Sequence, residues 1–262
     1  MSNTAEHHFS KDGSSTLYSN KFGQFYHNPN GAISESKHVF FDASGLTQAL
    51  DKTTDHLSIF EIGFGTGLNF LLLLDQYISK NLSFPIHFYS VEAFPVNEET
   101  ASKFNFSNFL EHEELNEILP NIFRQIQPGK NTFHPLTNSN VQLHLYYSLF
   151  EEIDSTDHKI NFILHDAFSP DVNQELWSVN TFKKLASFCT NDAVLSTYCA
   201  ASKARAAMAK AGWLIGRAPG ALGKREMTIA SLSEEKIVHL KRVHEQRLIE
   251  RLDSGEFEKV DD

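Results

Sequence analysis

Three glycines alternate with other residues in the segment Glu61-Ile62-Gly63-Phe64-Gly65-Thr66-Gly67, directly after a short apolar run. Glycine lets a backbone approach a ligand closely, and a helix that begins after such a turn offers free N–H groups. The G-x-G-x-G spacing differs from the G-x-G-x-x-G fingerprint of dinucleotide-binding folds, and the lysine of a phosphate-binding P-loop is missing. The competing interpretation is a glycine-rich turn without a ligand.

Acidic residues stand where three apolar runs end. A carboxylate at Glu61 disfavours a phosphate and suits a cation, such as a sulfonium that carries an amino group. Glu92 follows about one βαβ step later, where an acid accepts hydrogen bonds from ribose hydroxyls. Asp166 is expected beside the point where the strand order reverses, facing the ligand. A surface position for Glu92 and a helix cap for Asp166 are the alternatives. The glycine turn and Glu92 together predict an adenosyl cofactor.

These residues need a scaffold of alternating strands and helices, which is typical of a doubly wound parallel sheet and predicts the α/β class. The predicted parallel strands are 57–61, 86–91, 141–147, 160–164 and 193–197, and an antiparallel pair follows at 213–216 and 226–230. The predicted helices are 68–78, one or two within 97–126, 174–188 and 202–211.

The pattern divides the chain into three parts. Residues 1–55 form an arm with short strands at 22–27 and 38–41, joined through the turn Asn28-Pro29-Asn30-Gly31. Residues 56–232 form the α/β domain. Residues 233–262 form a charged tail, with an amphipathic helix expected over 238–252.

Composition narrows the function classes. A chain of 262 residues with 41% hydrophobic residues can bury a full core. Its two cysteines form no C-x-x-C motif, its N-terminus is polar, and its apolar runs are too short to span a bilayer. We therefore expect a cytoplasmic protein without a membrane partner. A net charge of −10 argues against broad nucleic-acid binding but allows a local basic patch, and the 13 histidines show no zinc spacing, so no metal is expected.

Several stretches together resemble one family, the methyltransferase domain of the tRNA 5-methylaminomethyl-2-thiouridine biosynthesis protein (MnmC) and its standalone relatives. The resemblance covers residues 12–232 and is carried by residues 61–70, Val91-Glu92-Ala93-Phe94-Pro95, Asp166-Ala167-Phe168-Ser169-Pro170, Asn173 to Trp177, Ser196-Thr197-Tyr198, Ala211-Gly212-Trp213 and Gly223-Lys224-Arg225-Glu226-Met227. The arm contributes Tyr26-His27, Gly31-Ala32 and Glu35-Ser36-Lys37-His38-Val39-Phe40.

The resemblance implies a Rossmann-like S-adenosylmethionine-dependent methyltransferase fold, with a mostly parallel seven-stranded sheet and a C-terminal antiparallel hairpin strand. It implies methyl transfer from S-adenosylmethionine to the exocyclic amine of 5-aminomethyl-(2-thio)uridine at the wobble position of tRNA. The expected cofactor-binding residues are Glu61, Gly63, Phe64, Gly65, Gly67, Leu68, Asn69, Glu92, Ala93, Leu149 and Asp166.

For catalysis we expect Asp166 to accept a hydrogen bond from the amine and Phe168 to pack against the uracil ring. The residues expected to meet substrate or RNA are Tyr26, Pro170, Lys224, Arg225 and Glu226, with Lys203 and Arg205 extending a basic patch. Tyr26 and His27 either close over the cofactor or simply pack in the arm.

Two departures from the family pattern matter. Tyr147-Ser148-Leu149 stands where relatives often carry Gly-Asp, so adenine would be held by backbone and apolar contacts. No second cofactor fingerprint follows, so we expect a chain without the FAD-dependent oxidase of the bifunctional members and a separate enzyme that supplies the aminomethyl precursor. Two alternatives stay open: a methyltransferase of the same fold that acts on a small-molecule or protein amine, and a non-catalytic module that binds S-adenosylmethionine.

Overall fold

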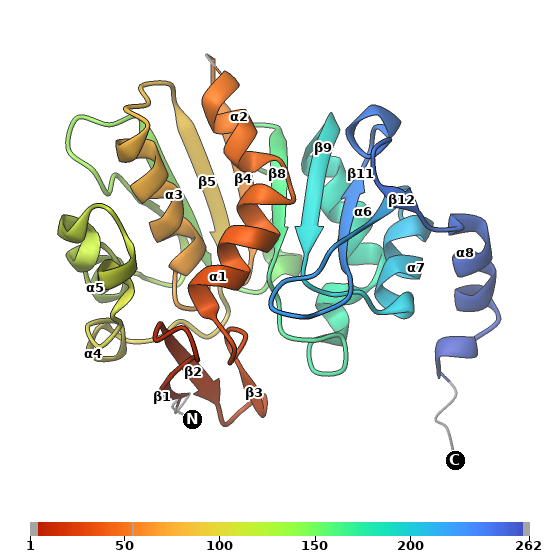
Figure 1. Ribbon diagram of the computed structural model, residues 1–262, viewed down its shortest axis with the longest axis horizontal. Helices are drawn as coiled ribbons and strands as arrows, with labels where there is room; N and C mark the ends of the chain where they lie inside the picture. The colour runs from red at the N-terminus through yellow and green to blue at the C-terminus, as the bar shows by residue number, and fades with distance from the viewer. Residues whose placement is uncertain (1–4, 54, 259–262) are drawn as a thin grey trace.

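The computed structural model describes residues 5–53 and 55–258, and one mixed β-sheet forms its centre (Figure 1). The sheet order is β12-β10-β11-β9-β8-β4-β5-β7-β6. Its strands are β4 (Leu57–Ile62), β5 (Ile86–Val91), β6 (Gly129–Phe133), β7 (Val141–Tyr147), β8 (Ile160–His165), β9 (Cys189–Thr197), β10 (Leu214–Ala218), β11 (Met227–Ser231) and β12 (Lys241–Arg242). The central strands β7, β5, β4, β8 and β9 run parallel, which confirms the predicted α/β class.

The chain reverses its direction of travel across the sheet between β4 and β8. From β4 it continues through β5 to β7 on one side, and it then returns to β8 and β9 on the other side. Ligands of open parallel sheets bind in the crevice outside the carboxyl ends of the strands at such a reversal. The glycine turn follows β4 and Asp166 follows β8, so the topology brings both to this crevice.

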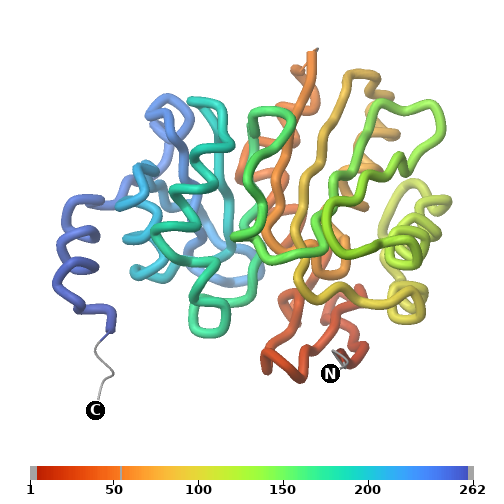
Figure 2. The backbone as a smooth tube through the Cα atoms, turned by 180° about the vertical axis from the view of Figure 1, so that it is seen from behind, coloured from red at the N-terminus to blue at the C-terminus, as the bar shows by residue number. Residues whose placement is uncertain are grey.

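Helices cover both faces of the sheet. They are α1 (Ala32–Ser36), α2 (Leu46–Lys52), α3 (Leu68–Ser79), α4 (Glu98–Ala101), α5 (Ile118–Gln125), α6 (Val179–Phe188), α7 (Ser202–Lys210) and α8 (Glu245–Asp253). The core has two parts. Leu57 and Ile59 of β4 pack with α1, α2, α3 and α5, whereas Phe60 and Ile62 pack with α6 and α7. Figure 2 shows the second face. Alternate residues of β4 serve opposite layers, which explains why the whole strand is buried.

The sheet is wider than expected, because two strands extend the seven that were predicted. β6 pairs antiparallel with β7 at one edge, and β12 pairs antiparallel with β10 at the other. β6 has the sequence Gly-Lys-Asn-Thr-Phe and is largely exposed, while β12 has only two residues. Edge strands need little apolar surface, so their hydrophobic pattern is weak.

The arm forms a second, antiparallel sheet of β1 (Ala5–Phe9), β2 (Ser15–Ser19) and β3 (Gln24–Phe25). A strand over 22–27 is therefore only partly correct, and the strand over 38–41 is wrong. Residues Lys37–Asp42 form a π-helix, η1, that continues α1. Val39, Phe40 and Phe41 are all buried, so the apolar run serves a helix packed on the core and not a strand.

The turn Asn28-Pro29-Asn30-Gly31 is present, but it leads into α1. The N–H of Gly31 donates to the carbonyl of Asn28 at 3.0 Å, and the Asn28 side chain accepts from the N–H of Asn30 at 3.0 Å. Figure 1 shows the small sheet below the carboxyl ends of the central strands, with α1 rising from it along the large sheet. The arm therefore lies where the topology places a ligand.

Two predicted helices have different bounds. The helix over 174–188 is divided into a 3₁₀ turn, η5 (Gln174–Trp177), and α6, because extended Ser178 caps α6 by accepting from the N–H of Thr181 at 3.2 Å. In the tail, β12 occupies part of the range 238–252, and α8 begins only at Glu245, where the His244 side chain accepts from the N–H of Arg247 at 3.3 Å.

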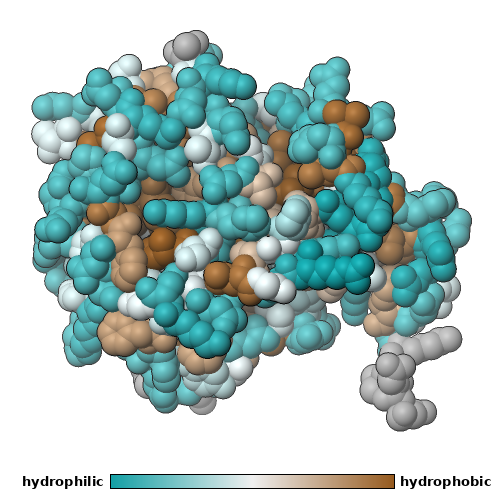
Figure 3. Space-filling model, viewed as in Figure 1, coloured by the Kyte–Doolittle hydropathy of each residue, from teal (hydrophilic) through white to brown (hydrophobic). Residues whose placement is uncertain are grey.

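The face shown in Figure 3 is mainly hydrophilic, with apolar side chains in small separate areas. Within the described residues, no helix combines the length and the apolar character that crossing a membrane requires. The division of the chain at residues 55 and 232 stays a prediction, since the large sheet itself continues into the tail through β12.

Candidate active site

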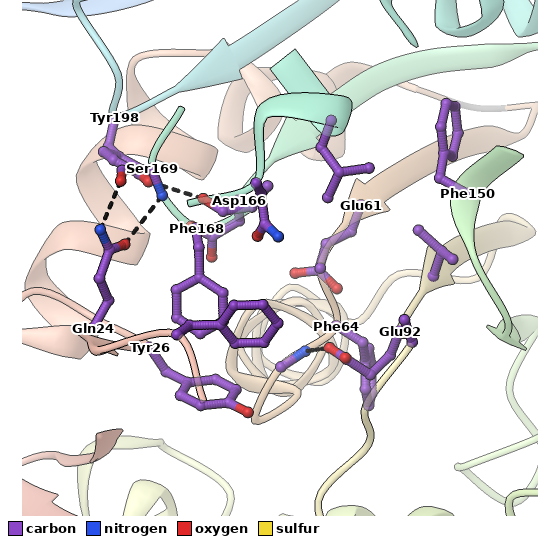
Figure 4. Close-up of a pocket in the computed structure, with 18 of the residues that line it drawn as sticks. Gln24, Tyr26, Glu61, Phe64, Glu92, Phe150, Asp166, Phe168, Ser169 and Tyr198 are labelled. Carbon is purple, nitrogen blue, oxygen red and sulfur yellow. Dashed lines mark hydrogen bonds between the residues drawn. The ribbon is translucent and has the colours of Figure 1, made fainter. Parts of the chain in front are cut away.

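A cleft of about 1050 Å³ lies at the carboxyl ends of the central strands, between the large sheet and the arm. Figure 4 shows its interior. The cleft brings together most of the residues expected to bind the cofactor: Glu61, Gly63, Phe64, Gly65, Leu68, Asn69, Glu92, Ala93, Leu149 and Asp166. It also contains Tyr26, Phe168 and Lys224, whereas Gly67, Pro170, Arg225 and Glu226 are not part of its wall.

The glycine turn is built from residues that other amino acids could not replace without strain. Gly63, Gly65 and Gly67 have φ values of 90°, 54° and 81°. A Cβ on Gly63 would lie 3.0 Å from the carbonyl oxygen of Asp166, and a Cβ on Gly65 would lie 3.2 Å from Cδ1 of Tyr26. The cleft therefore stays open at this turn because the side chains are absent.

Gly67 serves packing and not the cleft wall. It stands at the N-terminus of α3, and a Cβ on it would collide with Leu119 and Phe64. The expected contact of Gly67 with the cofactor stays a prediction. Close packing against Leu119 and Phe64 is a separate reason for glycine at this position.

Glu61 is the most buried carboxyl group of the site, with 1% of its surface exposed. Its Oε1 accepts from Nδ2 of Asn69 at 2.9 Å, and its Oε2 accepts from the hydroxyl of Ser90 at 2.9 Å. Burial raises the pKa of Glu61 to about 8, against the opposing effect of these two hydrogen bonds.

Asp166 is connected to Glu61 through Asn69. Nδ2 of Asn69 donates to Oδ2 of Asp166 at 3.2 Å as well as to Glu61. Burial, followed by the nearby charge of Glu61, raises the pKa of Asp166 well above its usual value. The two carboxyl groups are coupled, because ionisation of one makes ionisation of the other less favourable.

Glu92 follows β5 and is tied directly to the glycine turn. Its Oε2 accepts from the N–H of Gly65 at 2.8 Å, and its Oε1 accepts from the N–H of Phe94 at 2.8 Å. Burial raises its pKa. A carboxylate has about four acceptor positions, so each oxygen can still accept one further hydrogen bond from a ligand hydroxyl.

The rings of Tyr26 and Phe168 form the side of the cleft that faces Glu61 and Glu92, next to Asp166 (Figure 4). The ring of Phe168 lies 4.8 Å from that of Phe22 and 5.1 Å from that of Tyr26, measured between centroids. The Phe168 carbonyl accepts from Nε1 of Trp177 at 2.7 Å, which holds the loop after β8 in place. Such a wall presents flat apolar surface to a planar ligand.

The arm is fastened to this loop and to the glycine turn. Nε2 of Gln24 donates to the hydroxyl of Ser169 at 2.6 Å, and the N–H of Ser169 donates to Oε1 of Gln24 at 3.2 Å. Nε2 of His27 lies 2.8 Å from the hydroxyl of Thr66, and burial lowers the pKa of His27 to about 4. Both Tyr26 and His27 therefore pack against the site from the arm.

Two cleft residues had no role in the sequence-based prediction although their segments carried the family resemblance. Glu35 of α1 and Tyr198 after β9 both line the cleft. Oε1 of Glu35 accepts from Nζ of Lys224 at 2.9 Å, and the Tyr198 hydroxyl donates to the carbonyl of Ala167 at 2.8 Å. Their segments match the family, but only the tertiary structure brings them to the ligand side.

Leu149 lies at the end of the cleft beyond β7 and is 47% exposed. Its N–H donates to Oε2 of Glu152 at 3.2 Å, and the following Phe150 is buried. An apolar side chain thus occupies the place where the family pattern has an acid, which leaves apolar and backbone contacts for a flat ring.

The basic patch expected around Arg205 is wrong. Arg205 of α7 is 7% exposed, and it donates to the Thr228 hydroxyl at 2.9 Å, to Glu226 at 3.2 Å and to the Met227 carbonyl at 3.0 Å. Glu226 also pairs with Arg217 at 3.2 Å. Arg205 is therefore structural, because a buried charge requires such partners, while the expected contact of Glu226 with substrate or RNA stays a prediction.

An Arg205→Ala variant is expected to lower the free energy of unfolding by about 3 kcal/mol, since it removes the hydrogen bonds of Arg205 to Thr228, Glu226 and the Met227 carbonyl. Chemical denaturation at neutral pH measures this change. Lys203→Ala, on the exposed side of the same helix, serves as the control and should differ from the parent protein by less than about 0.5 kcal/mol. Equal stabilities of the two variants would contradict a structural role for Arg205.

The cleft residues fit an S-adenosylmethionine-type cofactor. Oδ1 of Asn69 is buried without a hydrogen-bond partner, so it can accept from a ligand N–H. Glu61, Glu92 and Asp166 form no ion pair within the described part of the chain, which suits a ligand that brings positive charge. For metal ions, the ranges 5–53 and 55–258 hold no group of three or more His, Cys, Asp or Glu side chains that could bind one.

Comparison with known proteins independently supports a methyltransferase fold. A model of the S-adenosyl-L-methionine-dependent methyltransferase family matches residues 111–233. A tRNA 5-methylaminomethyl-2-thiouridine biosynthesis bifunctional protein MnmC from Leptospira interrogans is 31% identical over 226 residues, which cover 84% of this chain and 34% of that protein. The protein of the same name from Campylobacter hominis is 32% identical over 213 residues, covering 80% of this chain and 30% of that one.

The chain spans about a third of the length of these curated relatives. Among solved structures, the crystal structure of MNMC2 from Aquifex aeolicus superposes with a TM-score of 0.70 and 23% identity, over 96% of this chain and 76% of that chain. The superposition supports the Rossmann-like methyltransferase fold, since it extends over nearly the whole chain.

Proposed function

We propose that the chain is an S-adenosyl-L-methionine-dependent methyltransferase, as its similarity to that family supports, and that it methylates the exocyclic amine of 5-aminomethyl-(2-thio)uridine at the wobble position of tRNA. One observation carries the proposal most directly. Glu61 is buried and Glu92 and Asp166 are half-buried around the glycine turn, none of them in an ion pair with a residue that the structure describes, and aromatic rings line the same cleft. The cleft thus offers one end to a cationic methyl donor and another to a flat base that carries an amine.

At the donor end, Glu61 and Asn69 would hold the amino group of the cofactor, and Glu92 would accept hydrogen bonds from its ribose hydroxyls. Gly63 and Gly65 leave room for the cofactor at the turn. Leu149 and Ala93 would contact its adenine, since both line the cleft. When bound, S-adenosylmethionine supplies an electrophilic methyl group on a sulfonium.

At the acceptor end, Asp166 would orient the amine. A primary alkyl amine is largely protonated near neutral pH, by analogy with lysine, and an ammonium has no lone pair to attack with. A bound ammonium would favour the ionised form of Asp166, whose pKa burial raises, and the carboxylate would then accept a hydrogen bond from the amine and help to remove one proton. The neutral amine would present its lone pair to the methyl group that the cofactor supplies, and Asp166 would pass the proton to solvent.

Phe168, with Tyr26 beneath it, would pack against the uracil ring. The wobble nucleotide must leave its stack to reach a cleft of this kind, and a ring that stacks on it compensates for the lost stacking. Two hydrogen bonds between Gln24 and Ser169 join the arm to the loop after β8 and keep this aromatic wall in place before the base arrives.

The function is tested by incubating the protein with S-adenosylmethionine and tRNA that carries the aminomethyl group, then digesting the tRNA to nucleosides and measuring their masses. The expected product is heavier by one methyl group. tRNA without the aminomethyl group is the matched control and should stay unchanged. Methylation of a small-molecule or protein amine, with no change in the tRNA, would favour the alternative substrate class.

A local cationic surface at the cleft mouth would receive the RNA backbone despite the net charge of −10. Arg225 is exposed and lies next to Lys224. Arg225→Glu is expected to weaken tRNA binding severalfold and to reduce its dependence on salt by about one phosphate contact. Filter binding at several salt concentrations measures both, with Lys210→Glu on α7 as the control. An unchanged affinity would place the RNA surface elsewhere.

The proposed reaction consumes an aminomethyl group, so we propose that an FAD-dependent oxidase or another enzyme that forms aminomethyl groups supplies the precursor. The tRNA substrate and that enzyme are the partners that the proposal requires.

A further inference from the structure

A second acidic group faces the cleft from the arm, opposite the carboxyl groups of the large sheet. Glu35 of α1 has a side chain that is 12% exposed and lines the same cleft as Asp166. Its negative charge raises the pKa of Asp166 and that of Tyr198, so the three groups share one region. The donor end described above does not use Glu35.

The two oxygens of this carboxylate have different surroundings. Oε1 accepts both from Nδ2 of Asn28 at 3.0 Å and from Nζ of Lys224 at 2.9 Å. Oε2 makes no hydrogen bond to any residue that the structure describes, and it is not among the buried atoms left without a partner. The carboxylate is therefore held firmly through one oxygen, while the other is free to accept from a ligand.

Lys224 pairs with Glu35 from a loop of the large sheet. It comes from the loop between β10 and β11, and its Nζ lies 4.9 Å from the centre of the Tyr198 ring. An ammonium over an aromatic face that is also paired with a carboxylate has a restricted position. The pair thus joins the arm to the large sheet and sets the direction in which Oε2 points.

We propose that Glu35 is a second carboxylate for the amine acceptor: its Oε2 accepts a hydrogen bond from the substrate ammonium and takes one proton from it, while Lys224 positions the carboxylate. The inference rests on the proposed amine methylation. Two carboxyl groups on different sides of the substrate accept from its N–H groups, and the loss of one proton to Glu35 frees the nitrogen lone pair that attacks the methyl carbon. The carboxyl group returns the proton to water after the product leaves.

The arrangement also favours a particular substrate class. An acceptor flanked by Glu35 and Asp166 should be a cationic amine, and a substituent that carries its own carboxylate should be repelled by like charge. The positive charge of Lys224 does not offset this, because Oε1 of Glu35 already pairs with it.

The test is the pH dependence of turnover for Glu35→Gln on tRNA that carries the aminomethyl group. At pH 7.5 we expect kcat to fall roughly tenfold to a hundredfold, below the full effect of a lone general base because Asp166 remains. The deficit should shrink as the pH approaches the amine's own pKa, near 10 by analogy with lysine, because the substrate then arrives unprotonated. Affinity for S-adenosylmethionine, measured by calorimetry, should not change.

Three further variants separate the outcomes. Glu35→Asp keeps the charge and should retain more activity than Glu35→Gln, while Lys224→Met should lower kcat less than Glu35→Gln and leave cofactor affinity intact. Glu151→Gln, an exposed carboxylate on the cleft wall, is the control and should behave like the parent protein.

A Glu35→Gln variant with parental kcat at pH 7.5 would overturn the inference, and so would a deficit that is equal at every pH, which indicates a merely structural role. If the parent protein methylates the tRNA, either result rejects the role of Glu35 alone. If the parent protein leaves the tRNA unmethylated, the proposed function fails and the inference falls with it.

Discussion

An Asp166→Ala variant is expected to lose methyl transfer, with kcat lowered by roughly 10²- to 10⁴-fold, while its affinity for S-adenosylmethionine changes by less than about tenfold. Asp166 stands after β8, within hydrogen-bond distance of Asn69 and on the cleft wall shared with Phe168. Its removal takes away the group that orients the amine but leaves Glu61 and Glu92 to hold the cofactor. Single-turnover kinetics measure the chemical step, and calorimetry measures binding.

The matched control is Asp171→Ala, an exposed acid in the same loop, which should keep parental turnover. Asp166→Asn adds a second check, because it preserves the shape and removes the charge. Near-parental turnover of either Asp166 variant would remove this residue from the chemistry. A large loss of cofactor affinity, with the chemical step intact, would instead make Asp166 a cofactor-binding group only.

A Glu61→Gln variant is expected to bind S-adenosylmethionine roughly 10- to 100-fold more weakly, the value of a charge-assisted hydrogen bond in a buried site. Glu61 is 1% exposed and bonded to Asn69 and Ser90, so water cannot replace the lost charge. Glu175→Gln, an exposed carboxylate on the cleft wall, is the control and should bind like the parent protein.

The pH dependence of binding gives a second signature. Burial raises the pKa of Glu61 to about 8, so between pH 6 and 7.5 the ligand-free protein carries this group protonated, and a cation that binds beside it must displace the proton. Affinity should therefore rise with pH in this range, approaching tenfold per pH unit, with proton release visible in calorimetry as a dependence of the heat on the buffer. Both effects should be smaller in Glu61→Gln, with the residual due to Asp166.

The same shift has the opposite sign for stability. The folded state binds this proton more tightly than the unfolded chain, so the stability contributed by Glu61 is fully present below about pH 4.5 and is lost as pH rises toward 8. The free energy of unfolding of Glu61→Gln, measured relative to that of the parent protein, should be higher at pH 8 than at pH 5. If Glu61→Gln shows the same pH dependence of cofactor binding and of unfolding as the parent protein, Glu61 does not titrate in this range.

Much of the site followed from residues that are close in sequence to a strand end. The apolar runs predicted seven of the nine strands of the large sheet, and the parallel strands then required the glycine turn, Glu92 and Asp166 to meet at one edge. The hydrophobic periodicity and the order of strands along the chain suffice to predict this meeting, because parallel strands have their carboxyl ends at the same edge of the sheet. The thirteen predicted cofactor and base-contacting residues that line the cleft belong almost entirely to such strand ends.

Other features depended on contacts between distant segments. The apolar pattern of residues 38–41 is compatible with a strand and with a helix. Packing of these residues against the core favours the π-helix η1. Charged residues could be assigned by type but not by direction: Arg205 was expected to extend a basic patch, yet it is buried and paired with Glu226. Charged side chains usually face water, and the sequence does not show which of them is the buried exception.

By itself the sequence determined the α/β class, the glycine turn and the carboxyl groups at the ends of the strands, because hydrophobic period and strand order are local properties that a parallel sheet converts into a common edge. Only the tertiary structure decided that the arm folds onto that edge, that Asn69 links Glu61 to Asp166, and that Glu35 meets Lys224 across the cleft. Glu35 and Lys224 are 189 residues apart in the sequence. No local sequence pattern specifies this pair, because it forms only when the arm packs against the large sheet.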